Sequence, residues 1–109
     1  MSVVTKTWGF YEDMFRSEDL VLKKLTILPG EKISHQKHFK RNEIWMVISG
    51  FGQLALNKKI TDIKPGDKFS VVIEDWHQVK NIGDSLLECY EIQQGFCSED
   101  DIERIEDII

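Results

Sequence analysis

Side chains that bind divalent metals occur in two stretches of this sequence, each framed by glycine. The first stretch holds Gln36, His38 and Glu43, and the second holds His77. Imidazole nitrogen, carboxylate oxygen and amide oxygen form a mixed ligand set that suits zinc, manganese, iron, cobalt or nickel. A small β-barrel can bring both stretches to one point, so we predict a single metal site, with zinc as the first expectation. The two spacings are Gly30-x5-Gln36-x-His38-x4-Glu43-x6-Gly50 and Gly66-x10-His77-x3-Asn81.

Strand periodicity decides which of these side chains can meet. Side chains two positions apart share a face, so Gln36 and His38 point one way and His35 points the other. An antiparallel hairpin would bring Glu43 back opposite Gln36 and His38, and a third strand would supply the ligand of the second stretch. Because a neutral amide is a weak ligand, Gln36 either coordinates the metal or hydrogen-bonds to a ligand. We interpret His35, outside the pattern, as a bystander.

The elements that must position these residues are β-strands. Short apolar and β-branched runs alternate with glycine, proline, asparagine and aspartate, which is typical of all-β proteins. We therefore predict an all-β fold, a double-stranded β-helix or jelly-roll barrel. The expected strands span residues 20–28, 32–38, 43–49, 53–56, 59–63, 68–72, 77–81 and 85–93.

The C-terminal segment, from Ser98 to Ile109, has a different pattern. Ser98 can cap a helix with Asp101 three residues later, and Ile102, Ile105 and Ile109 recur at helical spacing. The sequence therefore predicts one short helix packed on the barrel.

Composition bounds the class of protein. The 109 residues are 41% hydrophobic, which suits one domain, residues 1–109, with a real core. No run is long and apolar enough for a membrane span, the start lacks a signal peptide, and we expect a cytoplasmic protein.

A formal charge of -5 argues against nucleic acid as a partner. Cys89 and Cys97 do not form a disulfide framework, and we expect both to be reduced.

The ligand stretches resemble those of the cupin superfamily, with Gln36 where a first histidine is usual. Within cupins, the sequence is similar to the C-terminal domain of type II phosphomannose isomerases, which is commonly fused to mannose-1-phosphate guanylyltransferase. The similarity extends over nearly the whole chain. The motifs that carry it are Trp8-Gly9-Phe10-Tyr11-Glu12, the run from Pro29 to His38, Arg41-x-Glu43-x-Trp45-x-Val47-x-Ser49-Gly50, and Glu99-Asp100-Asp101-Ile102-x-Arg104-x-Glu106-Asp107.

This resemblance implies an enzyme that interconverts mannose 6-phosphate and fructose 6-phosphate with a divalent metal. It implies Arg41 as the active-site arginine, with Lys40 as a possible assistant. Moving a hydrogen between C1 and C2 passes through an enediolate, whose developing charge needs a metal or a fixed cation. The expected partners are a phosphosugar and a second copy of the chain in a homodimer. The metal ligands carried over are Gln36, His38, Glu43 and His77.

Some residues near the site depart from the family pattern. Lys40 stands where histidine is usual, Val72 and Glu74 replace a proline and a glycine before His77, and the pair Lys6-Thr7 replaces Arg-Pro. Two other functions therefore stay open. One is a metal-dependent cupin enzyme with another small substrate, including an oxygenase, and the other is a non-catalytic module that binds sugar or metal.

Overall fold

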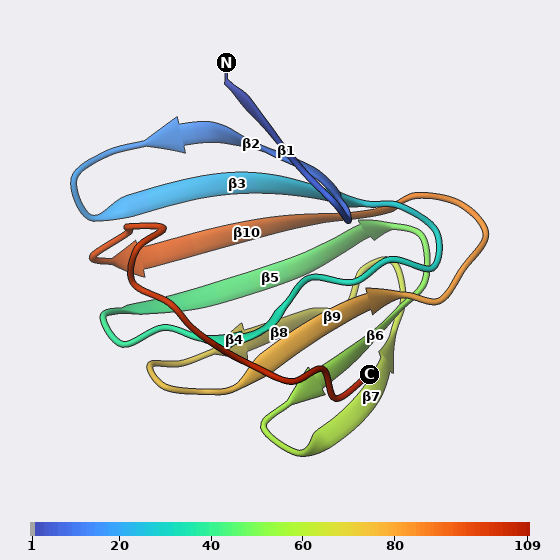
Figure 1. The fold of residues 1–109 in the computed structure, drawn as a ribbon. Helices are drawn as coiled ribbons and strands as arrows, with labels where there is room; N and C mark the ends of the chain where they lie inside the picture. The colour runs from blue at the N-terminus through green and yellow to red at the C-terminus, as the bar shows by residue number, and fades with distance from the viewer. Residues whose placement is uncertain (1) are drawn as a thin grey trace.

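A computed structural model describes residues 2–109, which form two antiparallel sheets that face each other (Figure 1). The jelly-roll class predicted from the sequence is confirmed. No helix occurs within residues 2–109, and so none that could cross a membrane. In spatial order, the six-stranded sheet holds β1 (Val3–Lys6), β2 (Gly9–Arg16), β3 (Leu20–Ile27), β10 (Leu87–Gly95), β5 (Arg41–Ser49) and β8 (Lys68–Val71). The five-stranded sheet holds β11 (Glu103–Ile105), β4 (His35–Lys37), β9 (His77–Asn81), β6 (Gly52–Leu56) and β7 (Lys59–Ile63).

The inward-facing residues of the central strands change from apolar to polar along each strand. In β5, the buried inward residues are Arg41 and Glu43 near the start of the strand and Trp45 and Val47 further along it. Its antiparallel neighbour β10 has the same change in the same direction across the sheet. The barrel is therefore packed with apolar side chains at one end and lined with polar side chains at the other. The inward residues of β10 are Leu87, Cys89, Glu91 and Gln93.

The apolar end forms the core. Trp45 is 1% exposed and stacks on Phe69 with 5.5 Å between ring centres, so it packs in the core as expected of a buried aromatic. Burial of this cluster supplies the main favourable term for folding. The core residues are Leu25, Ile27, Ile33, Trp45, Val47, Leu54, Ile63, Val71, Val79, Leu87 and Cys89.

The hairpin predicted between residues 32–38 and 43–49 is wrong. β4 pairs with β9 and β11 in one sheet, whereas β5 pairs with β10 and β8 in the other. Alternation of polar and apolar residues fixes which face of a strand is buried, but it does not fix the neighbouring strand. Glu43 therefore approaches His38 and His77 from across the barrel and not along a shared ladder.

The C-terminal helix predicted for Ser98 to Ile109 is also wrong. The signal at Ser98 is real but local, because Ser98 accepts a hydrogen bond from the Asp101 backbone in a single turn. Beyond that turn the chain extends, and β11 pairs with β4, whose edge otherwise has unpaired backbone groups. Tertiary pairing thus overrides the helical spacing of the isoleucines.

We expect the two cysteines to differ in reactivity. Both are free, and burial, together with the nearby Glu91, raises the pKa of the Cys89 thiol to about 12. Cys97 is only half-buried. Because the thiolate is the reactive form, a disulfide reagent should label one thiol in the native protein and two after unfolding, counted by mass spectrometry. Native labelling that persists in a Cys97→Ser variant would contradict this expectation.

Candidate metal centre

Three side chains with metal-binding atoms meet at the polar end of the barrel. His38 follows β4, His77 begins β9, and Glu43 extends inward from β5 in the opposite sheet. One ligand atom from each lies within 4.8 Å of the others. His38 Nε2 is 3.3 Å from Glu43 Oε2, and His77 Nε2 is 3.6 Å from Glu43 Oε1. Each residue is at most 4% exposed, so the group is shielded from water.

Backbone carbonyls set the tautomer of both imidazoles. His38 Nδ1 lies 2.6 Å from the Asp101 carbonyl oxygen, and His77 Nδ1 lies 3.2 Å from that of Asp75. A carbonyl can only accept a hydrogen bond, so each Nδ1 carries the proton and each Nε2 presents a lone pair to Glu43. Burial also lowers the pKa of both rings, which favours the neutral form.

This arrangement suits a cation. Two imidazole lone pairs and a carboxylate point at one another, and such acceptors repel unless positive charge lies between them. In the structure the Arg41 guanidinium provides it: Nε donates to Glu43 Oε2 at 2.9 Å, and one terminal nitrogen lies 3.1 Å from His38 Nε2. The donor set fits zinc, manganese or a similar ion, which His38, Glu43 and His77 would hold.

The charge on Glu43 depends on a second carboxyl group. Burial alone would raise the pKa of Glu43, but the hydrogen bond with Glu91 and nearby positive groups, Arg41 among them, lower it to about 2. Burial, the negative charge of Glu43 and the same hydrogen bond raise the pKa of Glu91 well above its usual range. The two pKa values are therefore shifted in opposite directions, so Glu43 is the more acidic member of the pair and Glu91 the less acidic one.

Gln36 lies beside this group. It is opposite His77 in the ladder between β4 and β9, it lines the cavity, and its Nε2 donates to the Ser34 carbonyl at 3.2 Å. That bond holds the amide in place. Whether Gln36 Oε1 coordinates the metal as a fourth ligand or hydrogen-bonds to a ligand stays a prediction.

Arg41 and Lys40 are adjacent in sequence but differ in place. Arg41 is 4% exposed, and besides its contacts with Glu43 and His38 it donates to the Ser98 carbonyl. Lys40 is exposed, with its Nζ 5.1 Å from the centre of the Phe96 ring, and it is not among the described residues that line the cavity. The structure thus brings Arg41 to the ligands and Lys40 to the outer surface.

The turn before His77 accommodates the departures at Val72 and Glu74. Glu74 has a φ of 68°, and its backbone N–H donates to the His38 carbonyl at 2.8 Å. Asp75 closes the turn by accepting from the Val72 backbone. This turn therefore links the two histidine-bearing segments without a glycine at position 74.

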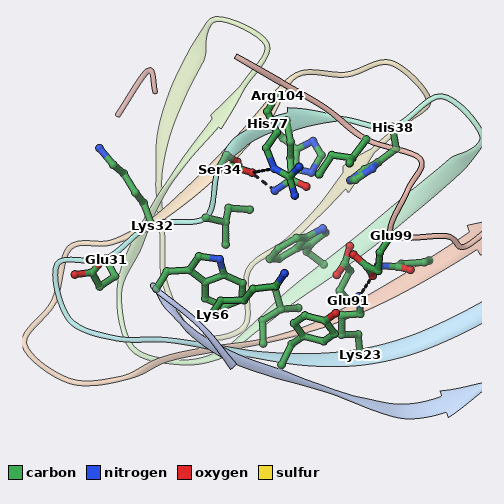
Figure 2. Close-up of a pocket in the computed structure, with 18 of the residues that line it drawn as sticks. Lys6, Lys23, Glu31, Lys32, Ser34, His38, His77, Glu91, Glu99 and Arg104 are labelled. Atoms are coloured by element: carbon green, nitrogen blue, oxygen red, sulfur yellow. Dashed lines mark hydrogen bonds and ion pairs between the residues drawn. The ribbon is translucent and has the colours of Figure 1, made fainter. Parts of the chain in front are cut away.

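A cavity of about 460 Å³ opens in front of the metal-binding group. Figure 2 shows His38, His77 and Arg104 on one side of it and Lys23, Glu91 and Glu99 on the other. The polar residues that β3, β10 and the C-terminal segment contribute to the cavity were not predicted as site residues from the sequence. The sequence does contain a signal for two of them. Lys23 and Glu91 lie two residues from buried apolar residues on their strands, so they share the inward face. The missed residues that line the cavity are Lys23, Glu91, Gln93, Glu99 and Arg104.

The C-terminal segment forms part of the cavity wall. Glu99 pairs with Lys23, whose side chain is 4% exposed, and Arg104 Nε donates to Ser34 Oγ at 3.2 Å. Ile102 also lines the cavity. The segment that was expected to be an outer helix therefore closes the site as an extended strand.

Comparisons with known proteins agree with this fold. The model of the family described as mannose-6-phosphate isomerase C-terminal matches residues 1–107. The alginate biosynthesis protein AlgA of Pseudomonas aeruginosa is 34% identical over 106 residues, 96% of this chain and 22% of that protein. A mannose-1-phosphate guanylyltransferase of Salmonella montevideo is 30% identical over 105 residues, 95% of this chain and 22% of that protein.

Among solved structures, the capsular polysaccharide assembling protein CapF from Staphylococcus aureus aligns over 97% of this chain and 34% of its own. The TM-score is 0.83 at 15% identity, a likeness of fold alone. The chain spans about a fifth, 22%, of the length of the two curated relatives. From the match over nearly its full length, the chain belongs to the mannose-6-phosphate isomerase C-terminal family.

Proposed function

We propose that this protein is a metal-dependent phosphosugar isomerase that interconverts mannose 6-phosphate and fructose 6-phosphate. The observation that carries the proposal is the convergence of His38, Glu43 and His77, with both histidines lining a polar cavity, in a chain of this family. A cavity of about 460 Å³ is within the usual range for small-molecule sites.

The reaction needs positive charge near C1 and C2 and a fixed orientation of the open-chain sugar. A bound divalent ion would supply Lewis acidity at the sugar oxygens. The carboxylate of Glu43 and the Nε2 atoms of the two histidines are oriented to hold that ion. Arg41 adds a buried, permanent positive charge beside them, suited to stabilising an enediolate oxygen.

The polar lining supports a phosphorylated and hydroxylated substrate. Lys6, Lys32 and Arg104 line the outer part of the cavity and offer positive charge for a phosphate. Lys23 and Glu91 lie deeper, on the inner face of the six-stranded sheet. A sugar phosphate with its carbonyl end toward the histidines would place its phosphate near positively charged side chains and its hydroxyls near polar ones.

We expect Arg41→Ala to lose turnover and keep the metal. A fixed cationic donor at a developing oxyanion is worth roughly 100- to 1000-fold in kcat. Metal should stay bound because Arg41 supplies no ligand atom. In this structure its guanidinium instead contacts two atoms that would hold the ion, Glu43 Oε2 and His38 Nε2. The measurement is a coupled assay of hexose phosphate interconversion, with metal content determined by elemental analysis. Arg16→Ala, at an exposed arginine outside the cavity, is the control.

Two outcomes would count against the isomerase. Wild-type protein that holds a full equivalent of metal and binds hexose phosphate without turnover would instead support a non-catalytic binding module. Oxygen consumption that depends on iron would support an oxygenase.

A further inference from the structure

Gln93 is a buried amide without a hydrogen-bond partner. It is 1% exposed, and neither Nε2 nor Oε1 has a partner anywhere in residues 2–109. A buried polar group left unpaired costs about 1–3 kcal/mol, so such groups are rare in native proteins. Gln93 also lines the cavity in front of the metal-binding group.

The neighbours of Gln93 leave only the cavity as a source of partners. On β10 it lies opposite Val21 of β3 on one side and Glu43 of β5 on the other. Valine has no polar side-chain atom, and the Glu43 oxygens accept from Arg41 and Trp45 but not from the Gln93 amide. Because the amide lines the cavity and is unpaired within residues 2–109, a molecule inside the cavity can supply its partner.

A second buried glutamine shows the contrast. Gln78 is 0% exposed, and its Nε2 donates to the Ile33 carbonyl and to Asp107, while its Oε1 accepts from the backbone of Ile108 and Ile109. Gln78 thus has the full set of bonds expected of a structural amide, whereas Gln93 has none.

We propose that Gln93 binds a hydroxyl group of the substrate, with its amide both donating to and accepting from the sugar. Its place opposite Glu43 on the neighbouring strand puts the bound hydroxyl close to the metal-binding group. The identity of the sugar as a hexose phosphate rests on the proposed function. The amide, being neutral, selects a hydroxylated ligand and not simply an anion.

The test is Gln93→Met, which keeps the size of the side chain and removes both polar atoms. We expect the affinity of the metal-loaded protein for mannose 6-phosphate, measured by calorimetry, to fall roughly 10- to 100-fold. Metal affinity should not change. The melting temperature should stay the same or rise, because removing an unpaired buried polar group is neutral or stabilising. Gln94→Met is the matched control, since Gln94 points to the outer face.

A deoxy sugar tests which hydroxyl is bound. Among the singly deoxygenated analogues of mannose 6-phosphate, the one that lacks the bound hydroxyl should bind wild-type protein more weakly than mannose 6-phosphate does. In Gln93→Met the two ligands should bind alike, because the partner of the hydroxyl is gone. The side-chain amide signals of Gln93 in a ¹⁵N spectrum should also shift on addition of mannose 6-phosphate but not of inorganic phosphate.

The outcomes separate this inference from the isomerase proposal. If Gln93→Met lowers the melting temperature and leaves sugar affinity unchanged, Gln93 is structural and the inference is wrong. It is also wrong if wild-type protein binds neither mannose 6-phosphate nor free mannose. Binding that depends on Gln93 without turnover would keep the inference and overturn the isomerase.

Discussion

His77→Ala should abolish the response of the protein to divalent metal. A ligand at 100 times its dissociation constant stabilises a folded protein by about 2.7 kcal/mol, which is roughly 10–20 °C in melting temperature for a domain of this size. His77 provides one of the three converging ligand atoms, and its neutral imidazole is held in the required tautomer. Without it, we expect the metal-induced rise in melting temperature to vanish. Thermal unfolding with and without each divalent ion measures the effect.

His35 provides the matched control. It is a buried histidine like His77, but its Nδ1 is bonded to the Glu106 carbonyl and its ring packs edge-on against Trp76, 5.4 Å between centres. His35→Gln should reduce stability and keep the metal-induced rise. If the rise disappears in the His35 variant and remains in His77→Ala, the assignment of the metal centre is wrong.

The sequence was sufficient to predict the class of fold and the clustering of three residues. The strands at 59–63 and 77–81 were predicted to the residue, because turn residues bracket the first and follow the second. His38 and Glu43 follow from alternation within their strands, since inward positions are fixed by the period of two. Once the barrel closes, His77 meets these two residues without any further assumption.

Other features depended on tertiary pairing that alternation does not encode. β1, the edge strand, and its neighbour β2 were missed because most of their residues are exposed or half-buried, without a strong apolar pattern. β4 pairs with β9, and the extended C-terminal segment pairs with β4. The sequence alone does not show which strand edge each of them joins, because the candidate edges have similar composition. Glu91 and Gln93 were overlooked because polar residues on an inward face gain meaning only once the cavity is known.

Asp101→Ala should weaken both the fold and the metal centre. Asp101 is 9% exposed, and its carboxylate accepts hydrogen bonds from the backbone of Phe39 and Lys40, at 3.0 and 2.9 Å. These bonds fix the turn between His38 and Arg41. Losing two bonds to a charged acceptor should cost about 2–4 kcal/mol of unfolding free energy, measured by urea denaturation. Metal affinity should fall roughly 10- to 100-fold, as for other groups that support a ligand.

The physical reason is that Asp101 holds the ligand twice. Its carboxylate shapes the turn, and its backbone carbonyl oxygen accepts a hydrogen bond from His38 Nδ1, which directs Nε2 toward Glu43. Asp101→Ala keeps this carbonyl but removes the carboxylate bonds that hold it beside His38. Asp101→Asn keeps one acceptor oxygen and should lie between wild type and Asp101→Ala, so the effect remains measurable if the alanine variant fails to fold. Asp100→Ala, one residue away and exposed, should change stability by less than about 0.5 kcal/mol. Equal metal affinity in all three variants would mean that the C-terminal segment covers the site without organising it.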